Sequence, residues 1–326
     1  DPACGSGNFL TETYLSLRRL ENKCLKLRFN GAVLDVFEDT VFVNIHQFYG
    51  IEINDFATVV AKTALWIAES QMMAETSKIL CRQLDFLPLK SYANVVEGNA
   101  LTIDWETVCP KNELNYIMGN PPFVGYSLQS EEQKKNILDV YVDEKGKPYK
   151  TAGKIDFVAG WYFKAAQLIQ GTKTKCAFVS TNSICQGEQV ASVFKPLYER
   201  FGFEIDFAYR TFRWDSESNL KAHVHCIVVG FSNKIPKQVR DDSHADSPCH
   251  AELVSASPKY IFDENGNKTE VKNINAYLID AENVFVESRN ESLCDVPQMI
   301  YGNKPVDGGL FYLTEEEKHA FLKAEQ

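Results

Sequence analysis

The sequence predicts an α/β fold built on a doubly wound, mainly parallel sheet with an antiparallel edge strand. Short apolar runs that suit strands alternate along the chain with longer segments whose apolar residues have helical spacing. Several of these runs end at Gly-Asn, as at residues 97–100 and 119–123, which is typical of a strand passing into a loop. The last two runs, residues 203–209 and 223–231, have no helix between them, which favours an antiparallel pair.

The elements follow from this periodicity in chain order. The predicted helices span residues 8–29, 55–73, 155–169 and 189–201. The predicted strands span residues 46–51, 94–96, 116–118, 176–180, 203–209 and 223–231. Within the last helix, Pro196 should cause a kink or mark the true start, because proline lacks the amide that an interior turn needs.

Composition places the chain among ordinary globular proteins. Of its 326 residues, 44% are hydrophobic and 24% are charged. The longest apolar stretches, such as residues 226–231, fall far short of the roughly 20 residues that cross a bilayer. The first residues, Asp1-Pro2-Ala3-Cys4, resemble no secretory leader. We therefore expect a cytoplasmic protein with no membrane partner.

Cysteine spacing and charge narrow the function classes further. Nine cysteines at irregular intervals include no CxxC pair, so we expect reduced thiols and no metal site. The net charge of -10 argues against a nucleic-acid partner, since phosphates attract cations. Residues 154–240 nevertheless hold 12 Lys and Arg against 7 Asp and Glu. A globally acidic chain can still present one cationic face.

The chain reads as part of a longer protein. A glycine-bearing turn at its start normally follows a buried strand, and we expect that strand to precede Asp1. We predict a core over residues 1–232 that lacks this first strand, and a polar insertion or linker over residues 233–258. Residues 259–326 are then the truncated start of a second domain.

Four loops carry the chemical signal, and the first opens the chain. In Asp1-Pro2-Ala3-Cys4-Gly5-Ser6-Gly7-Asn8-Phe9, two glycines let the backbone approach a ligand closely. The free amides of the following helix point toward such a ligand. A tight turn into a helix with no ligand explains the same residues.

The second and third loops each begin at the end of a predicted strand and contain a candidate residue, Glu52 and Asn99 respectively. Glu52 could accept hydrogen bonds from both ribose hydroxyls of a nucleotide, as acidic residues do in dinucleotide folds. It could equally be a surface acid that caps the next helix. Asn99, in Glu97-Gly98-Asn99-Ala100, could hydrogen-bond an adenine edge or could simply form a turn.

The decisive loop is Gly119-Asn120-Pro121-Pro122-Phe123, directly after a predicted strand. Two consecutive prolines hold the backbone extended and donate no hydrogen bonds. The Asn120 side-chain oxygen and the Pro121 carbonyl could thus accept from one exocyclic amino group. Phe123 would offer a flat face to the ring that bears this group. All these loops fall at the carboxyl ends of strands, where doubly wound sheets bind ligands.

Together these loops resemble the class I S-adenosylmethionine-dependent DNA amino-methyltransferases, specifically the N6-adenine enzymes. The resemblance implies their Rossmann-like fold and duplex DNA as the substrate. Downstream stretches are similar to single-chain type IIL/IIG restriction-modification methylases. These stretches are residues 177–190, 210–214, 223–231 and 302–309, the last similar to the start of a target-recognition region. On this resemblance, residues 1–232 are the methyltransferase domain and residues 259–326 begin the target-recognition region.

The resemblance also assigns roles to residues. The cofactor-binding residues implied by it are Asp1, Pro2, Ala3, Cys4, Gly5 and Gly7 for the methionyl part, Glu52 with Ile53 for the ribose, and Asn99 with Ala100 for the adenine. The family most often has Asp where this chain has Asn99, which puts cofactor affinity in question. The implied catalytic loop is Asn120, Pro121, Pro122 and Phe123.

DNA contacts are implied by the same resemblance. Trp214 or Phe212 would stack on the second face of the target base. Four cations in the positive stretch are candidate phosphate contacts: Lys195, Arg200, Arg210 and Arg213. The adenine must leave the base stack to be reached. The resemblance leaves open whether a nuclease domain is fused to the parent.

Three alternatives to this function stay open at the level of sequence. N4-cytosine methyltransferases use a related loop, although more often with Ser at its first position. Protein glutamine methyltransferases also hold a planar amide with an Asn-Pro-Pro-aromatic loop. The chain as given could also be inactive on its own.

Overall fold

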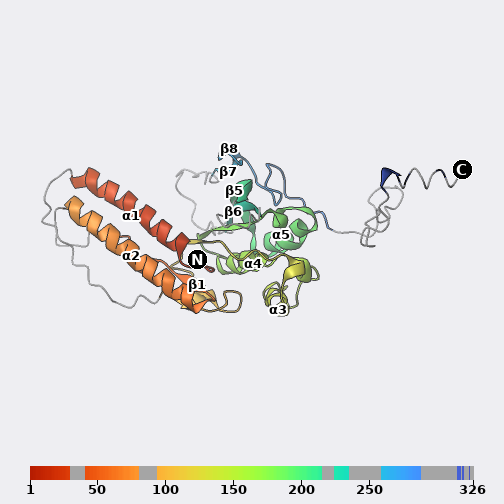
Figure 1. Cartoon of the computed structure of the whole chain (residues 1–326), viewed down its shortest axis with the longest axis horizontal. Coiled ribbons are helices and arrows are strands. Elements are labelled where there is room, and N and C mark those ends of the chain that lie inside the picture. The colour runs from red at the N-terminus through yellow and green to blue at the C-terminus, as the bar shows by residue number, and fades with distance from the viewer. Residues whose placement is uncertain are drawn as a thin grey trace, which may run out of the picture. The chain divides into compact units, whose positions relative to one another are not determined.

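The computed structural model describes residues 1–29, 41–80, 94–214, 224–234 and 258–287, together with 314–316, 318 and 323. The chain divides into two compact units, Asp1–Glu287 and Ser288–Gln326. The first unit contains all of the helices and strands described below (Figure 1).

The strands of the first unit form two hydrogen-bonded groups. One is the parallel pair β1 (Gly50–Glu52) and β2 (Val95–Glu97). The other runs in the order β3 (Tyr116–Gly119), β4 (Lys175–Thr181), β6 (Val224–Asn233), β5 (Phe203–Trp214), β7 (Lys259–Phe262) and β8 (Lys268–Val271). β3 and β4 are parallel, whereas β6 lies antiparallel between β4 and β5. The predicted α/β fold is confirmed, with parallel pairs at the strands that carry the candidate loops.

Helices cover these strands and bury a large aromatic core. They are α1 (Asn8–Phe29), α2 (Asp55–Leu80), α3 (Glu131–Val140), α4 (Ala159–Leu168) and α5 (Gly187–Phe201). Tyr162 of α4 stacks on Phe231 of β6 with ring centroids 5.4 Å apart, and both are fully buried. Such aromatic contacts hold α4 against the sheet.

The structure differs from the sequence prediction at several element boundaries. The predicted strand over residues 46–51 begins instead as a 3-10 helix, Ile45–Gln47, because Asn44 and Gln47 form a capping box. α3 was not predicted, although Ser130 and Gln133 form the same kind of box at its start. Pro196 lies inside α5 and does not mark its beginning.

The first compact unit also extends past the predicted linker. β7 pairs with β5, and β8 pairs with β7, so residues 259–271 belong to the same sheet as the preceding strands. The unit ends at Glu287, not near residue 258. The short apolar run of β7 gains its structure from this pairing, which composition alone does not reveal. Residues 235–257, most of the predicted linker, lie outside the described residues.

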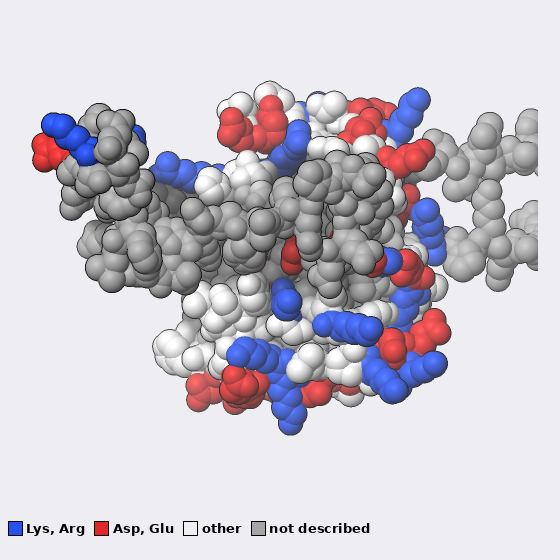
Figure 2. Space-filling view, turned by 90° about the vertical axis from the view of Figure 1, so that its right-hand side faces the viewer, with Lys and Arg blue, Asp and Glu red and all other residues white. Residues whose placement is uncertain are grey.

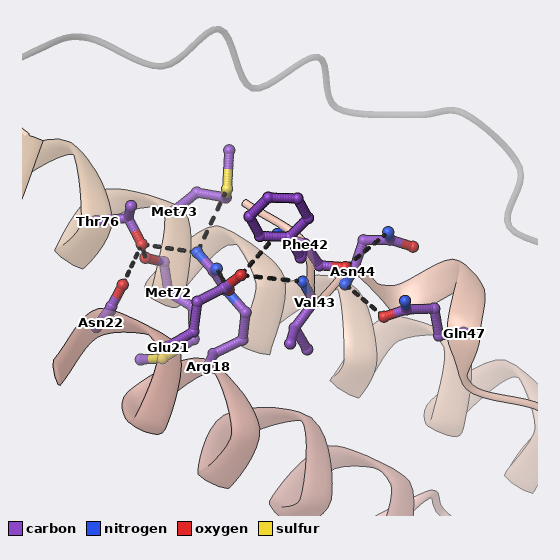
Figure 3. Close-up of polar contacts among 10 residues, drawn as sticks. All are labelled: Arg18, Glu21, Asn22, Phe42, Val43, Asn44, Gln47, Met72, Met73 and Thr76. Atoms are coloured by element: carbon purple, nitrogen blue, oxygen red, sulfur yellow. Dashed lines mark hydrogen bonds and ion pairs between the residues drawn. The ribbon is translucent and has the colours of Figure 1, made fainter. Parts of the chain in front are cut away.

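α1 and α2 lie side by side and share a buried polar network (Figures 1 and 3). The Arg18 side chain of α1 is fully buried and forms an ion pair with Glu21. Its guanidinium also donates to Thr76 Oγ of α2 over 2.6 Å, and Thr76 contacts Asn22 Oδ1 at 2.8 Å. Glu21 in turn accepts from the backbone amide of Phe42 over 2.6 Å. Buried polar groups need such partners, so the network fixes one register between the two helices.

Candidate active site at the ends of the parallel strands

The first loop lies along the edge of β1. The backbone nitrogen of Asp1 donates to the Tyr49 carbonyl over 2.8 Å. The Ile51 amide donates to the Asp1 carbonyl over 3.0 Å, and the Cys4 amide donates to the Ile51 carbonyl over 3.1 Å. A Cβ atom at Gly50 would lie 2.8 Å from Cys4 Sγ, so β1 needs glycine there for the loop to pass this closely.

Two glycines of this loop have the left-handed conformation, with φ +54° at Gly5 and +85° at Gly7. A Cβ atom at Gly7 would lie 3.0 Å from Ala61 of α2, so Gly7 lets α1 begin against α2. A Cβ atom at Gly5 would meet nothing within 4 Å. The loop therefore has an open face at Gly5, where a ligand can approach the backbone.

The Glu52 carboxylate at the end of β1 faces this loop. It is half-buried, and it accepts from the Gly5 amide over 2.8 Å and from the Asn54 amide over 3.0 Å. A carboxylate has about four acceptor sites, so capacity remains for two hydroxyl groups. The cap of α2 is Asn54, whose side chain accepts from the Ala57 amide over 2.9 Å. Glu52 therefore does not cap that helix. Its neighbour Ile53 is exposed.

The third loop, at Asn99, adjoins the second loop, at Glu52, because β1 and β2 pair along the β1–β2 ladder. Glu52 lies opposite Glu97, and the Gly98 amide donates to the Glu52 carbonyl over 2.8 Å. The half-buried Asn99 accepts from the Leu101 amide through Oδ1 over 2.9 Å, which makes it part of a turn. Since an amide oxygen has a second lone pair, this turn leaves one acceptor site at Asn99. The adjoining Ala100 is buried.

The Asn-Pro-Pro-Phe loop follows β3 directly and lies beside the first loop. Asn120 and Pro122 are exposed, Pro121 is buried and Phe123 is half-buried. A Cβ atom at Gly119 would lie 2.5 Å from Asp1 Oδ1, so the Asp1 carboxylate packs against the start of this loop. Asp1 Oδ1 also accepts from the Ala3 amide over 3.0 Å. The structure thus brings the first loop and the Asn-Pro-Pro-Phe loop together and leaves the Asn120 side chain at the surface.

α4 holds two of these loops through side chains that sequence reasoning did not single out. Trp161 Nε1 donates to the Pro2 carbonyl over 2.9 Å. Lys164 Nζ donates to the carbonyls of Ala100 and Leu101 over 2.8 and 3.2 Å. Burial lowers the pKa of Lys164 to about 8. The sequence feature that could have indicated this role is that Lys164 is the single charged residue of a mostly apolar helix.

The surroundings of the thiol in the first loop disfavour its thiolate form. Cys4 is buried, and burial raises the pKa of its thiol to about 11. Within the part of the chain that the structure describes, no three His, Cys, Asp or Glu residues are grouped so that they could hold a metal ion. Among the same residues, no helix is long and apolar enough to span a bilayer.

A cavity of about 510 Å³ lies beside the first loop, between β1 and β3. Of the predicted ligand residues, Asp1 and Pro2 line it, whereas Glu52, Asn99 and Asn120 do not. Its walls include Tyr49 to Ile51 and Tyr116 to Met118, which belong to the strands and the chain just before them. This cavity therefore borders the first loop at Asp1 and Pro2 and lies apart from the Glu52, Asn99 and Asn120 side chains.

The predicted phosphate contacts fall into two pairs. Lys195 forms an ion pair with Glu287 at 2.5 Å. Arg200 donates to the Val142 carbonyl, and its guanidinium lies 5.6 Å from the centre of the Phe163 ring. The other two, Arg210 and Arg213, are exposed on β5. Exposure therefore distinguishes Arg210 and Arg213 from the other two cations, although Arg213, like Lys195 and Arg200, also interacts within the protein.

Charge is mixed on the face that Figure 2 draws, where Lys and Arg side chains alternate with Asp and Glu.

Of the two predicted stacking residues, Phe212 is half-buried on β5 opposite Cys226 of β6. Trp214 ends β5, and its side chain lies outside the described residues.

Two family profiles match the chain. The profile described as "MmeI, DNA-methyltransferase domain" matches residues 1–240. The chain belongs to the MmeI family. A second profile, "MmeI, target recognition domain", matches residues 280–326. The candidate loops therefore lie within the region that matches the MmeI DNA-methyltransferase domain.

Individual relatives agree with this family. The chain is 38% identical over 320 residues to DNA methyltransferase A of Bacillus subtilis (strain 168), covering 97% of the chain and 33% of that protein. It matches a solved structure of the type IIL restriction-modification enzyme MmeI in complex with DNA, with a TM-score of 0.81 and 40% identity. That match covers 99% of this chain and 41% of MmeI. The chain thus spans about a third to two fifths of the length of these two relatives.

Proposed function

We propose that this chain is the catalytic part of a site-specific DNA methyltransferase in a restriction-modification or phage-defence system. It transfers a methyl group from S-adenosylmethionine to N6 of an adenine rotated out of duplex DNA. The observation that carries the proposal is the position of Asn120: its side chain is exposed at the end of β3, beside the loop that begins at Asp1. An Asn120 amide buried against the sheet would have excluded this chemistry.

The donor and acceptor groups of the first three loops fit the proposed cofactor. Gly5 leaves open space over the backbone, as a bulky ligand requires. Glu52 keeps acceptor sites for two ribose hydroxyls, and Asn99 keeps one for an adenine amino group. When bound, S-adenosylmethionine supplies a methyl group on a sulfonium, which needs no further activation.

The chain's own residues then act on the base. The Asn120 side-chain oxygen and the Pro121 carbonyl accept the two protons of the adenine amino group. These bonds favour a more tetrahedral nitrogen, whose lone pair is less delocalised into the ring. Phe123 packs on one face of the base, and Phe212 or Trp214 on the other. Catalysis is mainly alignment and exclusion of water, since no covalent intermediate on cysteine is needed.

DNA as the substrate is supported by the family profiles, which name a DNA-methyltransferase domain and a target recognition domain. Arg210 and Arg213 are the proposed phosphate contacts, because both are exposed on β5. Phosphate contacts offset the cost of extruding the base, a few kcal/mol. A DNA-modifying enzyme of this kind works in the cytoplasm, and a nuclease in the longer parent would make it a complete restriction system.

The test compares methylated nucleosides formed by the longest natural chain that carries this sequence and by its Asn120→Ala variant. Duplex DNA is incubated with S-adenosylmethionine, digested to nucleosides and analysed by mass spectrometry. We expect N6-methyladenine from the wild type and a rate at least about 100-fold lower from the variant, since each aligned transition-state bond contributes strongly.

Asn115→Ala is the matched control for this experiment. Asn115 is also exposed, but it precedes β3, at the opposite end of the strand from Asn120. We expect it to methylate DNA at the wild-type rate. Detection of N4-methylcytosine would overturn the assignment to adenine. Incorporation into a protein substrate and not into DNA would overturn the assignment to DNA.

A further inference from the structure

Asp156 is a buried carboxylate that the mechanism above does not use. It lies just before α4 and is only 6% exposed. Its carboxylate accepts three hydrogen bonds, two through Oδ1 and one through Oδ2. No ion pair involving Asp156 is found among the described residues, so hydrogen-bond donors compensate its burial.

The three donors come from three separate segments. The Tyr126 amide, in the chain that leaves the Asn-Pro-Pro-Phe loop, donates to Asp156 Oδ1 over 3.1 Å. Gln189 Nε2 of α5 donates to the same oxygen, also over 3.1 Å. Ser183 Oγ, in the loop after β4, donates to Oδ2 over 2.5 Å. Hydrogen bonds to a charged acceptor are about twice as strong as neutral ones, so this carboxylate ties the segments firmly.

The backbone beside Asp156 adds a second tie to the same loop. The Phe157 amide donates to the Val124 carbonyl over 2.9 Å. The loop over residues 120–123 is therefore fixed at both ends. Its entry is held by the β3–β4 ladder, in which Gly119 pairs with Phe178. Its exit is held by Asp156 and Phe157. The loop that contains the exposed Asn120 is therefore a short segment between two hydrogen-bonded points.

We propose that Asp156 is a positioning residue that sets the conformation of the loop over residues 120–123 through the Tyr126 amide. This inference rests on the proposed function, because the loop is the one that would hold the target base. Asp156 itself does not touch the base or the cofactor. It acts by fixing where the Asn120 oxygen and the Pro121 carbonyl lie relative to the first loop.

Two substitutions at Asp156 separate its geometry from its charge. Asp156→Asn keeps an oxygen that can accept from Tyr126 and Gln189, and its amide nitrogen can donate to Ser183 Oγ. Asp156→Ala removes all three bonds. We expect Asp156→Ala to lower kcat for DNA methylation about 100-fold, the effect of a misplacement of about 1 Å. We expect Asp156→Asn to stay within about tenfold of the wild type, since it keeps the bonds from Tyr126 and Gln189 and reverses only the direction of the Ser183 bond.

The kinetic readout is normalised to the number of cofactor-binding sites, measured by titration calorimetry with S-adenosylmethionine. A merely structural role would reduce the number of sites without changing kcat per site. Positioning predicts a lower kcat per site at an unchanged cofactor Kd, because the Asp156 side chain binds Tyr126, Ser183 and Gln189 and none of the residues in the loops at Gly5, Glu52 and Asn99. Equal kcat per site for the wild type and Asp156→Ala overturns the inference. Equal losses from the Ala and Asn variants also overturn it.

A second measurement does not depend on catalysis. Hydrogen exchange of peptides over residues 119–128, followed by mass spectrometry, reports the order of the loop directly. We expect faster exchange there in Asp156→Ala. The control is Asp206→Ala, because Asp206 of β5 is a half-buried carboxylate that accepts from Ser232 Oγ over 3.1 Å. It should leave this region unchanged.

The two proposals fail in distinguishable ways. A wild-type chain that transfers no methyl group to DNA contradicts the proposed function, and hydrogen exchange alone then decides the role of Asp156. Exchange over residues 119–128 that is the same in Asp156→Ala and the wild type overturns that role, whether or not the chain methylates DNA.

Discussion

The α1–α2 pair and the loops at Gly5, Glu52, Asn99 and Asn120, which together form the loop cluster, use polar side chains in opposite ways. Between α1 and α2, Arg18 and Thr76 are both 0% exposed and bind one another and their neighbours (Figure 3). In the loop cluster, Glu52 is half-buried and Asn120 is exposed, and Glu52 keeps free acceptor sites. The comparison teaches that buried polar groups that bind one another specify the fold, whereas acceptor sites left open at strand ends are available to a ligand.

This difference predicts separate consequences for stability and for binding. A buried charge that loses its partner has no solvent to replace it, so the folded state bears the full cost. A group at the loop surface can return to water when a bond is lost. Substitutions in the helix pair should therefore act on the free energy of unfolding, and substitutions in the loops on ligand affinity or rate.

The largest effect on stability is expected from Arg18→Met. The variant leaves Glu21 without its cation and Thr76 without the guanidinium donor, and we expect the free energy of unfolding to fall by about 3 to 5 kcal/mol. The matched control is Lys134→Met, which breaks an i,i+3 pair with Glu131 whose side chains are 40% and 92% exposed. That loss should stay below about 1 kcal/mol. Urea unfolding measures both, and equal losses would remove the contrast between buried and exposed pairs.

A smaller effect, on affinity and not on stability, is expected from Glu52→Gln. The neutral amide has one oxygen to share between Gly5, Asn54 and the ribose, so we expect the Kd for S-adenosylmethionine to rise between about ten- and 100-fold. Calorimetric titration measures this change. Glu97→Gln is the control, because Glu97 is exposed and lies opposite Glu52 in the β1–β2 ladder. A Kd unchanged by Glu52→Gln would show that the ribose binds elsewhere.

The smallest effect is a pH dependence at Lys164. Burial lowers its pKa to about 8 from the model-peptide value near 10.5, so between these values the unfolded chain binds more protons than the folded chain. The cost of the buried charge is thus present below pH 8 and relieved as the pH rises through this window. The free energy of unfolding of the wild type should rise relative to Lys164→Met between about pH 8 and 10.

The control for this prediction comes from the other region of the comparison. Arg18→Met removes the buried cation between α1 and α2 and leaves Lys164 in place, so any pH dependence that comes from Lys164 is common to both chains. The difference in unfolding free energy between the wild type and Arg18→Met should therefore stay constant from pH 8 to 10. A wild-type stability that falls relative to Lys164→Met over this range would contradict the lowered pKa.

Much of the fold follows from local patterns. The apolar spacing of residues 8–29 predicts α1 at its observed ends, and the start of α2 at Asp55 is also predicted. The run over residues 46–51 misleads because a capping box at Asn44 turns its first residues into a 3-10 helix. The strands β7 and β8 were missed because a strand of four residues is stabilised mainly by its neighbours.

The candidate site likewise has features that the sequence predicts and features that it does not. Glycine and proline restrict the backbone locally, so the first loop and the Asn-Pro-Pro-Phe loop can be located from sequence alone. The partners of the charged residues cannot be predicted from the sequence alone. Lys195 and Arg200 look like surface cations in the sequence, yet they contact Glu287 and the Val142 carbonyl. No local rule brings residues so distant in sequence together.

The sequence by itself determined most of the helices and strands, the glycine turn at Gly5 and Gly7, and the extended loop at Asn120. These features depend on the φ and ψ preferences of adjacent residues and on apolar spacing within one element. Only the tertiary structure decided which groups meet: Gly119 with Asp1, Tyr126 with Asp156, and Arg18 with Thr76. Such pairs are chosen by the packing of whole elements, because burial leaves each polar group dependent on whatever partner the fold brings within reach.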